Sequence, residues 1–169
     1  MKKLITLGAF ALFGAMQAQE NSGATSKGKW VVETNAGTPM HLYGGGTGFL
    51  LTSADGDTIW NVGAEGGYFV SDNLAVKAGL GYGDYFGSGI FSYRVGLQYY
   101  INGKFPVAAD FSGISADDDN LNWLGLEGGY AWFVASNVAI TPKVRYNFTL
   151  DENKSASTFQ GLIGFSLFF

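Results

Sequence analysis

The sequence predicts an all-β protein, a closed antiparallel eight-stranded transmembrane β-barrel. The chain of 169 residues contains 26 glycines and 16% aromatic residues, but only 14% charged residues. Apolar and polar residues alternate with a period of two through most of the chain, which is typical of β-strands. The connections between these segments are alternately short and longer, as in barrels that cross a membrane.

The composition excludes several classes of protein. The chain has no cysteine, which excludes a disulfide scaffold, a cysteine-ligated zinc site and an iron–sulfur cluster. Its net charge of −4 and pI of about 4.8 argue against a nucleic-acid partner, because such proteins carry a basic face. The glycine-rich stretches lack the lysine and the strand–helix context of a phosphate loop. We therefore expect no cofactor and no resident metal.

The first eighteen residues have the pattern of a secretory signal peptide. Lys2 and Lys3 precede an apolar run over 4–15, and the small Ala18 suits cleavage before Gln19, or a residue or two away. An apolar run of this length is too short to cross about 30 Å of hydrocarbon as a helix, and no later segment is apolar for long enough. We expect a cleaved peptide over 1–18, a periplasmic tail over 19–28 and the barrel over 29–169.

The alternation marks the individual strands of the barrel. Each membrane crossing of a β-barrel takes roughly 9 to 11 residues, so a barrel of the expected size fits this chain length. The expected strands are 30–36, 58–70, 74–85, 90–101, 107–114, 121–134, 138–150 and 158–169.

The two faces of each strand differ in chemistry, and the difference predicts which face points inward. In the strand expected over 90–101, one face carries Phe91, Val95 and Leu97, and the other carries Arg94 and Gln98. Charges of both signs alternate with small glycines on the polar face, as a narrow lumen requires. We expect the apolar face to contact lipid, and a charge network in the lumen formed by Glu33, Glu65, Lys77, Arg94, Asp110, Glu127, Lys143 and Arg145.

An internal repeat defines the register of two hairpins. Residues 63–76 recur as 125–140, with two extra residues in the second copy. An even insertion keeps the same side chains pointing inward. Pairing across the turns places Glu127 opposite Arg145 and leaves Glu65 diagonal to Lys77, so we expect ion pairs inside the barrel.

Aromatic residues gather near both ends of the expected strands. Such rings are typical of the two membrane interfaces. The residues near the short turns are Trp30, Tyr68, Tyr99, Trp132 and Phe169, and those toward the longer loops are Trp60, Tyr82, Tyr93, Tyr146 and Phe159.

Two features fit this prediction poorly. Pro142 lies in the middle of a strand, where one hydrogen bond of the ladder is lost or replaced. The segment 37–57 contains a further hairpin-like pattern, with arms around 49–52 and 58–60. We interpret it as an extension of the first hairpin above the membrane. Alternatively, 49–53 belongs to the first strand and 30–36 is peripheral.

Taken together, the signal peptide, the alternating strands, the hairpin over 66–75 and the terminal run over 161–169 resemble the small outer-membrane β-barrel family of OmpX and the OmpA transmembrane domain. The resemblance implies the Gram-negative outer membrane, periplasmic termini, extracellular long loops, and outer-membrane lipids and lipopolysaccharide as surroundings. It also implies that the barrel assembly machinery reads a C-terminal signal made of Ile163, Phe165, Leu167 and Phe169.

The resemblance does not define an activity, because this fold serves many functions. A lumen of eight strands is about as wide as its own side chains, so we expect little or no conductance. The leading hypothesis is a structural or surface-interaction protein, whose acidic extracellular loops contact an unknown ligand. The alternatives are a narrow porin-like channel for small solutes and, less favoured, a lipid-modifying enzyme.

Few residues support a chemical site. His41 is the single histidine and lies in a glycine-rich stretch without a neighbouring nucleophile pattern, so we expect no catalytic residue. Asp110 and Glu127 are an acid pair, but nearby basic residues favour structural pairing. Asp117, Asp118 and Asp119 form a candidate loop cation site, since carboxylates are suitable calcium ligands.

Overall fold

The computed structural model describes residues 23–37, 47–54, 57–85, 87–116 and 119–169. Within these ranges no helix is both long and apolar enough to cross a membrane. The described residues form ten strands, which are β1 (Trp30–Gly37), β2 (Gly48–Ala54), β3 (Asp57–Ser71), β4 (Leu74–Tyr85), β5 (Ser88–Ile101), β6 (Phe105–Ala116), β7 (Asp119–Gly129), β8 (Trp132–Ala135), β9 (Val138–Thr149) and β10 (Thr158–Phe168).

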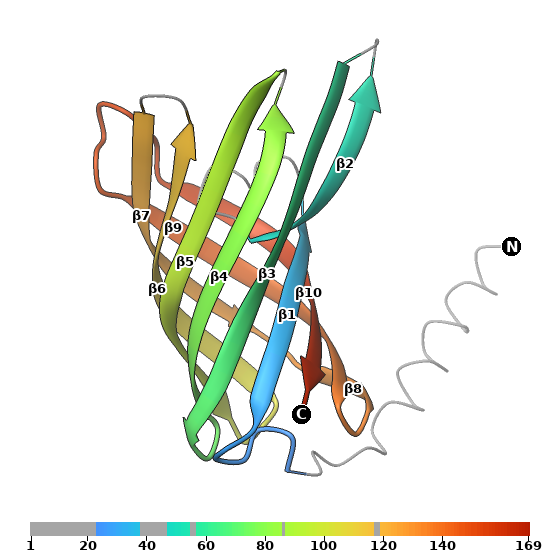
Figure 1. Cartoon of the computed structure of the whole chain (residues 1–169). Helices are drawn as coiled ribbons and strands as arrows, with labels where there is room; N and C mark the ends of the chain where they lie inside the picture. The colour runs from blue at the N-terminus through green and yellow to red at the C-terminus, as the bar shows by residue number, and fades with distance from the viewer. Residues whose placement is uncertain (1–22, 38–46, 55–56, 86, 117–118) are drawn as a thin grey trace, which may run out of the picture.

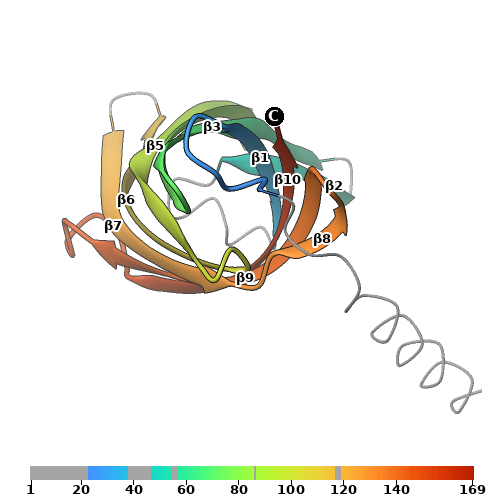
Figure 2. The same cartoon turned by 90° about the horizontal axis from the view of Figure 1, so that it is seen from below.

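These strands form one closed sheet, which is seen along its axis in Figure 2. Neighbours follow the order β10, β1, β2, β3, β4, β5, β6, β7, β9, and the ring closes because β9 also pairs with β10. The first and last strands meet in a full antiparallel ladder, and Trp30 and Phe169 exchange two backbone hydrogen bonds. The start of β1 and the end of β10 therefore lie at the same end of the barrel (Figure 1).

The expected count of eight strands is wrong, because nine strands form the ring and β8 lies outside it. The additional member of the ring is β2, which we expected as an extension above the membrane. Near the end of the barrel that carries the termini, β3 pairs with residues Trp30–Glu33 of β1. Toward the opposite end, β3 pairs with residues Leu50–Ala54 of β2. The segment β2 runs parallel to β1 and is thus inserted between β1 and β3 in the upper wall.

The strand expected over 121–134 is divided into β7 and β8. Both segments pair with β9, one after the other, and Tyr130 and Ala131 separate them. The division lies next to the two extra residues of the second copy of the repeat, Ala131 and Trp132, which follow the repeated Tyr130. The backbone N–H of Ala131 leaves the ladder and donates to the carbonyl of Lys104 in the neighbouring turn, at 2.7 Å.

Pro142 explains why the ladder is interrupted at this level. The carbonyl of Pro142 accepts the N–H of Tyr130, and in an antiparallel pair the N–H and C=O of one residue point to the same neighbour. The N–H that proline lacks would therefore point at the gap between β7 and β8. On the other side of β9, the ladder with β10 continues through Pro142 and Ile163.

The two copies of the repeat share one more backbone feature, a change of register close to the turn. In the first copy the shift lies between Phe69 and Ser71, and in the second between Phe133 and Ala135. These are equivalent positions. In both copies the phenylalanine before the shift is buried, so the two extra residues preserve the inward face as expected.

The orientation of the wall is confirmed. The apolar residues of the outer face are exposed, for example Val95 at 52% and Val144 at 53%, whereas Arg94 and Lys143 beside them are buried at 6% and 4%. A water-soluble β protein shows the opposite arrangement, since burial of apolar surface drives its folding.

Exposed aromatic rings gather toward both ends of this apolar wall. Trp30 contacts Tyr68 near the end that carries the termini, with ring centroids 4.9 Å apart. Trp60 contacts Tyr82 toward the other end, at 6.0 Å. Of the ten rings expected at the interfaces, all but Trp132 and Tyr93 are exposed, and these two are intermediate.

An apolar cluster fills the lumen at the end that carries the termini. Phe168 contacts three other rings, those of Phe69, Tyr100 and Phe133, at centroid distances of 5.3 to 6.3 Å. Residues 23–29 lie across this end (Figure 2). Thr25 is buried and joins the β3–β4 turn, where its hydroxyl donates to Asn73 at 2.6 Å.

Several expectations lie outside the described residues. They include the signal peptide and its cleavage site within 1–22, His41 within 38–46, and Asp117 and Asp118 of the candidate cation site.

Candidate functional site: the charged lumen

The structure brings the eight predicted lumen charges together in the middle of the barrel. Seven strands contribute to this group: β1, β3, β4, β5, β6 and β7 give one charge each, and β9 gives two. The charges meet because these side chains all lie on the inward face of the barrel. All eight side chains are at most 7% exposed. Four acids and four bases are present, so the group is neutral as a whole.

The ion pairs form a closed cycle in which acids and bases alternate. In order around the cycle the members are Glu33, Lys77, Glu65, Arg94, Asp110, Arg145, Glu127 and Lys143, which returns to Glu33. We call this group the charge cycle. Every charge therefore has at least two oppositely charged neighbours, which offsets much of the cost of burying it.

One half of the charge cycle is tightly bonded. Lys77 lies 3.1 Å from Glu33 and 2.9 Å from Glu65, and Lys143 lies 2.5 Å from Glu33 and 3.0 Å from Glu127. All four distances are within the range of charge-assisted hydrogen bonds or close to it.

The other half contains three longer contacts. Arg94 is 3.7 Å from Asp110 and 3.8 Å from Glu127, and Arg145 is 3.7 Å from Glu127. Two strong links remain here: Arg94 donates to Glu65 at 2.7 Å, and Arg145 binds Asp110 through two parallel hydrogen bonds of 2.6 and 2.7 Å.

Neutral side chains complete the coordination of the charges. Gln98 is expected on the inward face, but the sequence does not mark any of these residues as a partner of the charges, because amides and hydroxyls also occur on solvated faces. They donate to or accept from the cycle at 2.5 to 3.3 Å and comprise Asn35, Thr47, Gln98, Ser112, Asn147 and Ser166.

Inward glycines provide the space for the long charged side chains. A Cβ atom placed on Gly125 would overlap the guanidinium of Arg145, and one on Gly79 would approach Glu65 and Thr47. By contrast, a Cβ on the outward Gly161 meets no atom within 4 Å. The glycine pattern of the inward face thus follows from the packing of the charge cycle.

Little space remains beside the charge cycle. One small cavity of about 10 Å³ lies against the charge cycle and is lined by Glu65, Lys77, Arg94, Gln98, Asp110 and Glu127, among others. A volume of this order accommodates about one water molecule. No residue is placed for catalysis in it, since both carboxylates of the candidate acid pair, Asp110 and Glu127, are bound to basic side chains.

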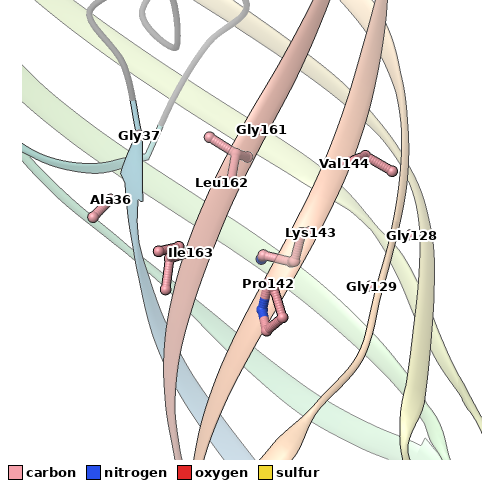
Figure 3. Close-up of a pocket in the computed structure, with 10 residues that line it drawn as sticks. All are labelled: Ala36, Gly37, Gly128, Gly129, Pro142, Lys143, Val144, Gly161, Leu162 and Ile163. Atoms are coloured by element: carbon pink, nitrogen blue, oxygen red, sulfur yellow. The ribbon is translucent and has the colours of Figure 1, made fainter. Parts of the chain in front are cut away.

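A larger recess lies on the outer wall, around Pro142 (Figure 3). It has a volume of about 750 Å³ and extends over β1, β7, β9 and β10. Small outward residues produce it, namely Ala36, Gly128 and Gly161 beside Val144 and Ile163. It is a mostly apolar groove of the lipid-facing type; Lys143 also lines it, but the ammonium group of Lys143 is ion-paired with Glu33 and Glu127 in the lumen.

The remaining predicted residues lie at the two ends of the barrel. Ile163, Phe165, Leu167 and Phe169 point outward toward the end that carries the termini and are 38% to 57% exposed. Among the described residues, no three His, Cys, Asp or Glu side chains are placed to hold a metal ion. The backbone of Asp119 begins β7, but the structure does not describe its two neighbours in the candidate cation site.

A closed barrel with an apolar exterior and an ionic lumen defines the class of small membrane-spanning β-barrels. No protein-family model matches the sequence, and no curated protein sequence matches it. Solved structures do. The chain superimposes on the N-terminal β-barrel domain of Pseudomonas aeruginosa OprF with a TM-score of 0.53 and 13% identity, covering 85% of this chain and 98% of that one.

Two further structures give the same result. Neisserial surface protein A matches with a TM-score of 0.51 and 15% identity, over 83% of this chain and 97% of that one. A de novo designed transmembrane β-barrel matches with a TM-score of 0.50 and 16% identity, over 85% and 98% of the two chains. The chain therefore has the fold of small outer-membrane β-barrels, as the resemblance to OmpX and OmpA implied.

Proposed function

We propose that the protein is an integral barrel of the Gram-negative outer membrane with a structural or surface-interaction role, and that its lumen does not conduct solutes. The observation that carries the second part is the charge cycle. Eight buried, mutually bonded side chains fill the middle of the lumen, and the cavity beside them holds about one water molecule. A permeating solute would have to break several buried ion pairs at once.

Planar-bilayer recording tests this proposal. The full-length protein, refolded in detergent, should give no stable conductance steps, and the outer-loop variant Glu152→Gln should behave in the same way. Its fold is checked on the same preparation by gel migration before and after boiling. Stable steps of nanosiemens size from a preparation with the folded band would overturn the non-conducting lumen.

The membrane location is supported by the wall of exposed apolar residues and by the aromatic residues near both of its ends. Such a surface is stable only where water is absent. Fractionated outer membranes should release the protein only with detergent, as a band that shifts on boiling. Extraction by high salt or alkaline buffer alone would contradict an integral barrel.

The outer loops are the proposed contact surface. At the end opposite the termini, Asp151 and Glu152 are exposed beside Lys154, and Asp84 lies at the end of β4. An acidic surface of this kind favours a basic partner. Intact cells should bind a fluorescent oligolysine peptide, and Asp151→Asn with Glu152→Gln at equal surface amounts should bind less. Equal binding would argue against these loops as the contact surface.

An enzymatic role is not part of this proposal. The lipid A of cells with and without the protein should give the same mass spectra, because the described lumen offers only carboxylates that are already paired with bases. A new or missing lipid A species would favour the lipid-modifying alternative.

A further inference from the structure

The longer contacts of the charge cycle lie next to one another. Arg94 takes part in two of the three, with Asp110 at 3.7 Å and with Glu127 at 3.8 Å, and Arg145 with Glu127 makes the third at 3.7 Å. These separations exceed the length of a direct hydrogen bond. The weak links are therefore concentrated in one sector of the lumen, which we call the loose sector, between β5, β6, β7 and β9.

Two polar atoms in this sector have no hydrogen-bond partner among the described residues. They are Nε of Arg94, which is a donor, and Oε2 of Glu127, which is an acceptor. The two side chains are only 5% and 4% exposed. An unpaired buried polar atom costs roughly 1 to 3 kcal/mol, and more when the group is charged, so both atoms require a partner.

The small cavity of the lumen lies at the same place. Arg94, Asp110 and Glu127 line it, together with Gln98 of β5 and Ala108 of β6. Its volume of about 10 Å³ is that needed for one water molecule and is too small for a column of water.

The chemistry of the two atoms defines the ligand. The Nε–H of Arg94 needs a hydrogen-bond acceptor, and Oε2 of Glu127 needs a hydrogen-bond donor. The ligand must therefore both accept and donate a hydrogen bond. A halide ion can accept a hydrogen bond but cannot donate one, and a metal cation cannot accept the N–H. Because the charge cycle is already neutral, it does not call for a further ion. We propose that a single, permanently bound water molecule occupies this cavity, accepts from Nε of Arg94 and donates to Oε2 of Glu127, and so closes the loose sector of the charge cycle.

This site can be tested by NMR on the folded full-length protein in detergent micelles. The Hε proton of Arg94 should show a cross-peak to water whose sign, in paired NOESY and ROESY spectra, is that of a long-lived bound water rather than of chemical exchange. A visible Hε signal without such a cross-peak would overturn the proposal, as would a scalar coupling that shows a direct hydrogen bond to Asp110 or Glu127.

Substitutions at Ala108 provide a matched pair. Ala108→Val places two methyl groups at the cavity and should abolish the water cross-peak of Arg94 Hε. Ala108→Thr has the same shape and supplies a hydroxyl, so the water cross-peak should again be lost while Hε gains a hydroxyl contact. Gel migration before boiling verifies that both variants fold.

The test also separates this proposal from that of the non-conducting lumen. Cross-peaks to water at Arg145 Hε and at the inward amides as well would indicate a hydrated lumen, and would overturn both proposals. Persistence of the cross-peak in Ala108→Val would place the water elsewhere and overturn the assignment of this cavity alone.

Discussion

Glu33 is the residue on which three strands converge. Its carboxylate binds Lys77 of β4 and Lys143 of β9, and it accepts the hydroxyl of Ser166 from β10 at 2.8 Å. With an exposed fraction of 1%, it is among the most buried acids of the protein. Its removal leaves two buried ammonium groups with one partner fewer.

We expect Glu33→Ala to lower the free energy of unfolding by about 3 to 5 kcal/mol, the usual cost of removing one partner from a buried ion pair. Urea titration in lipid vesicles measures this change. The control is Glu152→Ala on an exposed loop, which should stay within about 0.5 kcal/mol of the wild type. Equal stability of the two variants would show that the charge cycle contributes nothing to folding.

Glycine at position 125 is required by the side chain of Arg145, not by the backbone. We expect Gly125→Ala to displace that guanidinium from Asp110 and to destabilise the barrel by about 1 to 3 kcal/mol, as overpacking does. The matched variant Gly161→Ala points outward into open space and should be neutral or slightly stabilising. The same urea titration compares them, and a larger effect at position 161 would contradict the packing argument.

At the scale of the elements, β9 tolerates proline because its neighbour is interrupted there. Pro142→Val should therefore change the free energy of unfolding by no more than about 1 kcal/mol. Val144 is the next outward residue and pairs with Gly128 in an intact ladder, so Val144→Pro should cost about 2 kcal/mol or more through a lost and unpaired backbone group. A mild effect at position 144 would mean that the interruption has no protective role.

The strands that could be predicted are those with regular alternation. The bounds of β4 agree with the prediction to the residue, and those of β1, β3, β5, β6, β9 and β10 agree within two residues at each end. The predicted orientation of the wall was correct because a period of two assigns every second side chain to one face. The repeat also gave the Glu127–Arg145 register.

The remaining features could not be predicted from alternation. β2 contributes only a few residues to the wall and runs parallel to β1, a pairing that the local pattern of 48–54 does not encode. The interruption between β7 and β8 depends on a proline in a different strand. For the charge cycle, the alternation of the sequence identified the eight inward charges. Their neutral hydrogen-bond partners and the longer contacts around Arg94 depend on three-dimensional packing.

At the scale of the whole molecule, the barrel has two chemically different ends. Residues 23–29, the aromatic cluster and both termini of the barrel lie at one end, and the loop over 151–157 lies at the other (Figure 1). The proposed location requires the first end to face the periplasm. Because the chain contains no cysteine, single cysteines can report on each end separately.

We expect Asn153→Cys to react with a polyethylene-glycol maleimide in intact cells, because this exposed loop faces the medium in the proposed orientation. Ser136→Cys, exposed in the turn before β9, should react only after the outer membrane is opened. A gel shift of the labelled protein measures both reactions. Labelling of Ser136→Cys but not of Asn153→Cys in intact cells would show the reverse orientation.

The charge cycle joins residues that lie far apart along the chain, so it can assemble only late in folding. Glu33 and Lys143 are 110 residues apart, and Ser166 is 133 residues from Glu33. A growing or partly inserted barrel that lacks its last two strands keeps Lys77 beside Glu33 but has neither Lys143 nor Arg145, so its interior holds four acids and only two bases. Completion of the ring and neutralisation of its interior are thus one event, and an unfinished barrel carries its own electrostatic penalty until the final strand arrives.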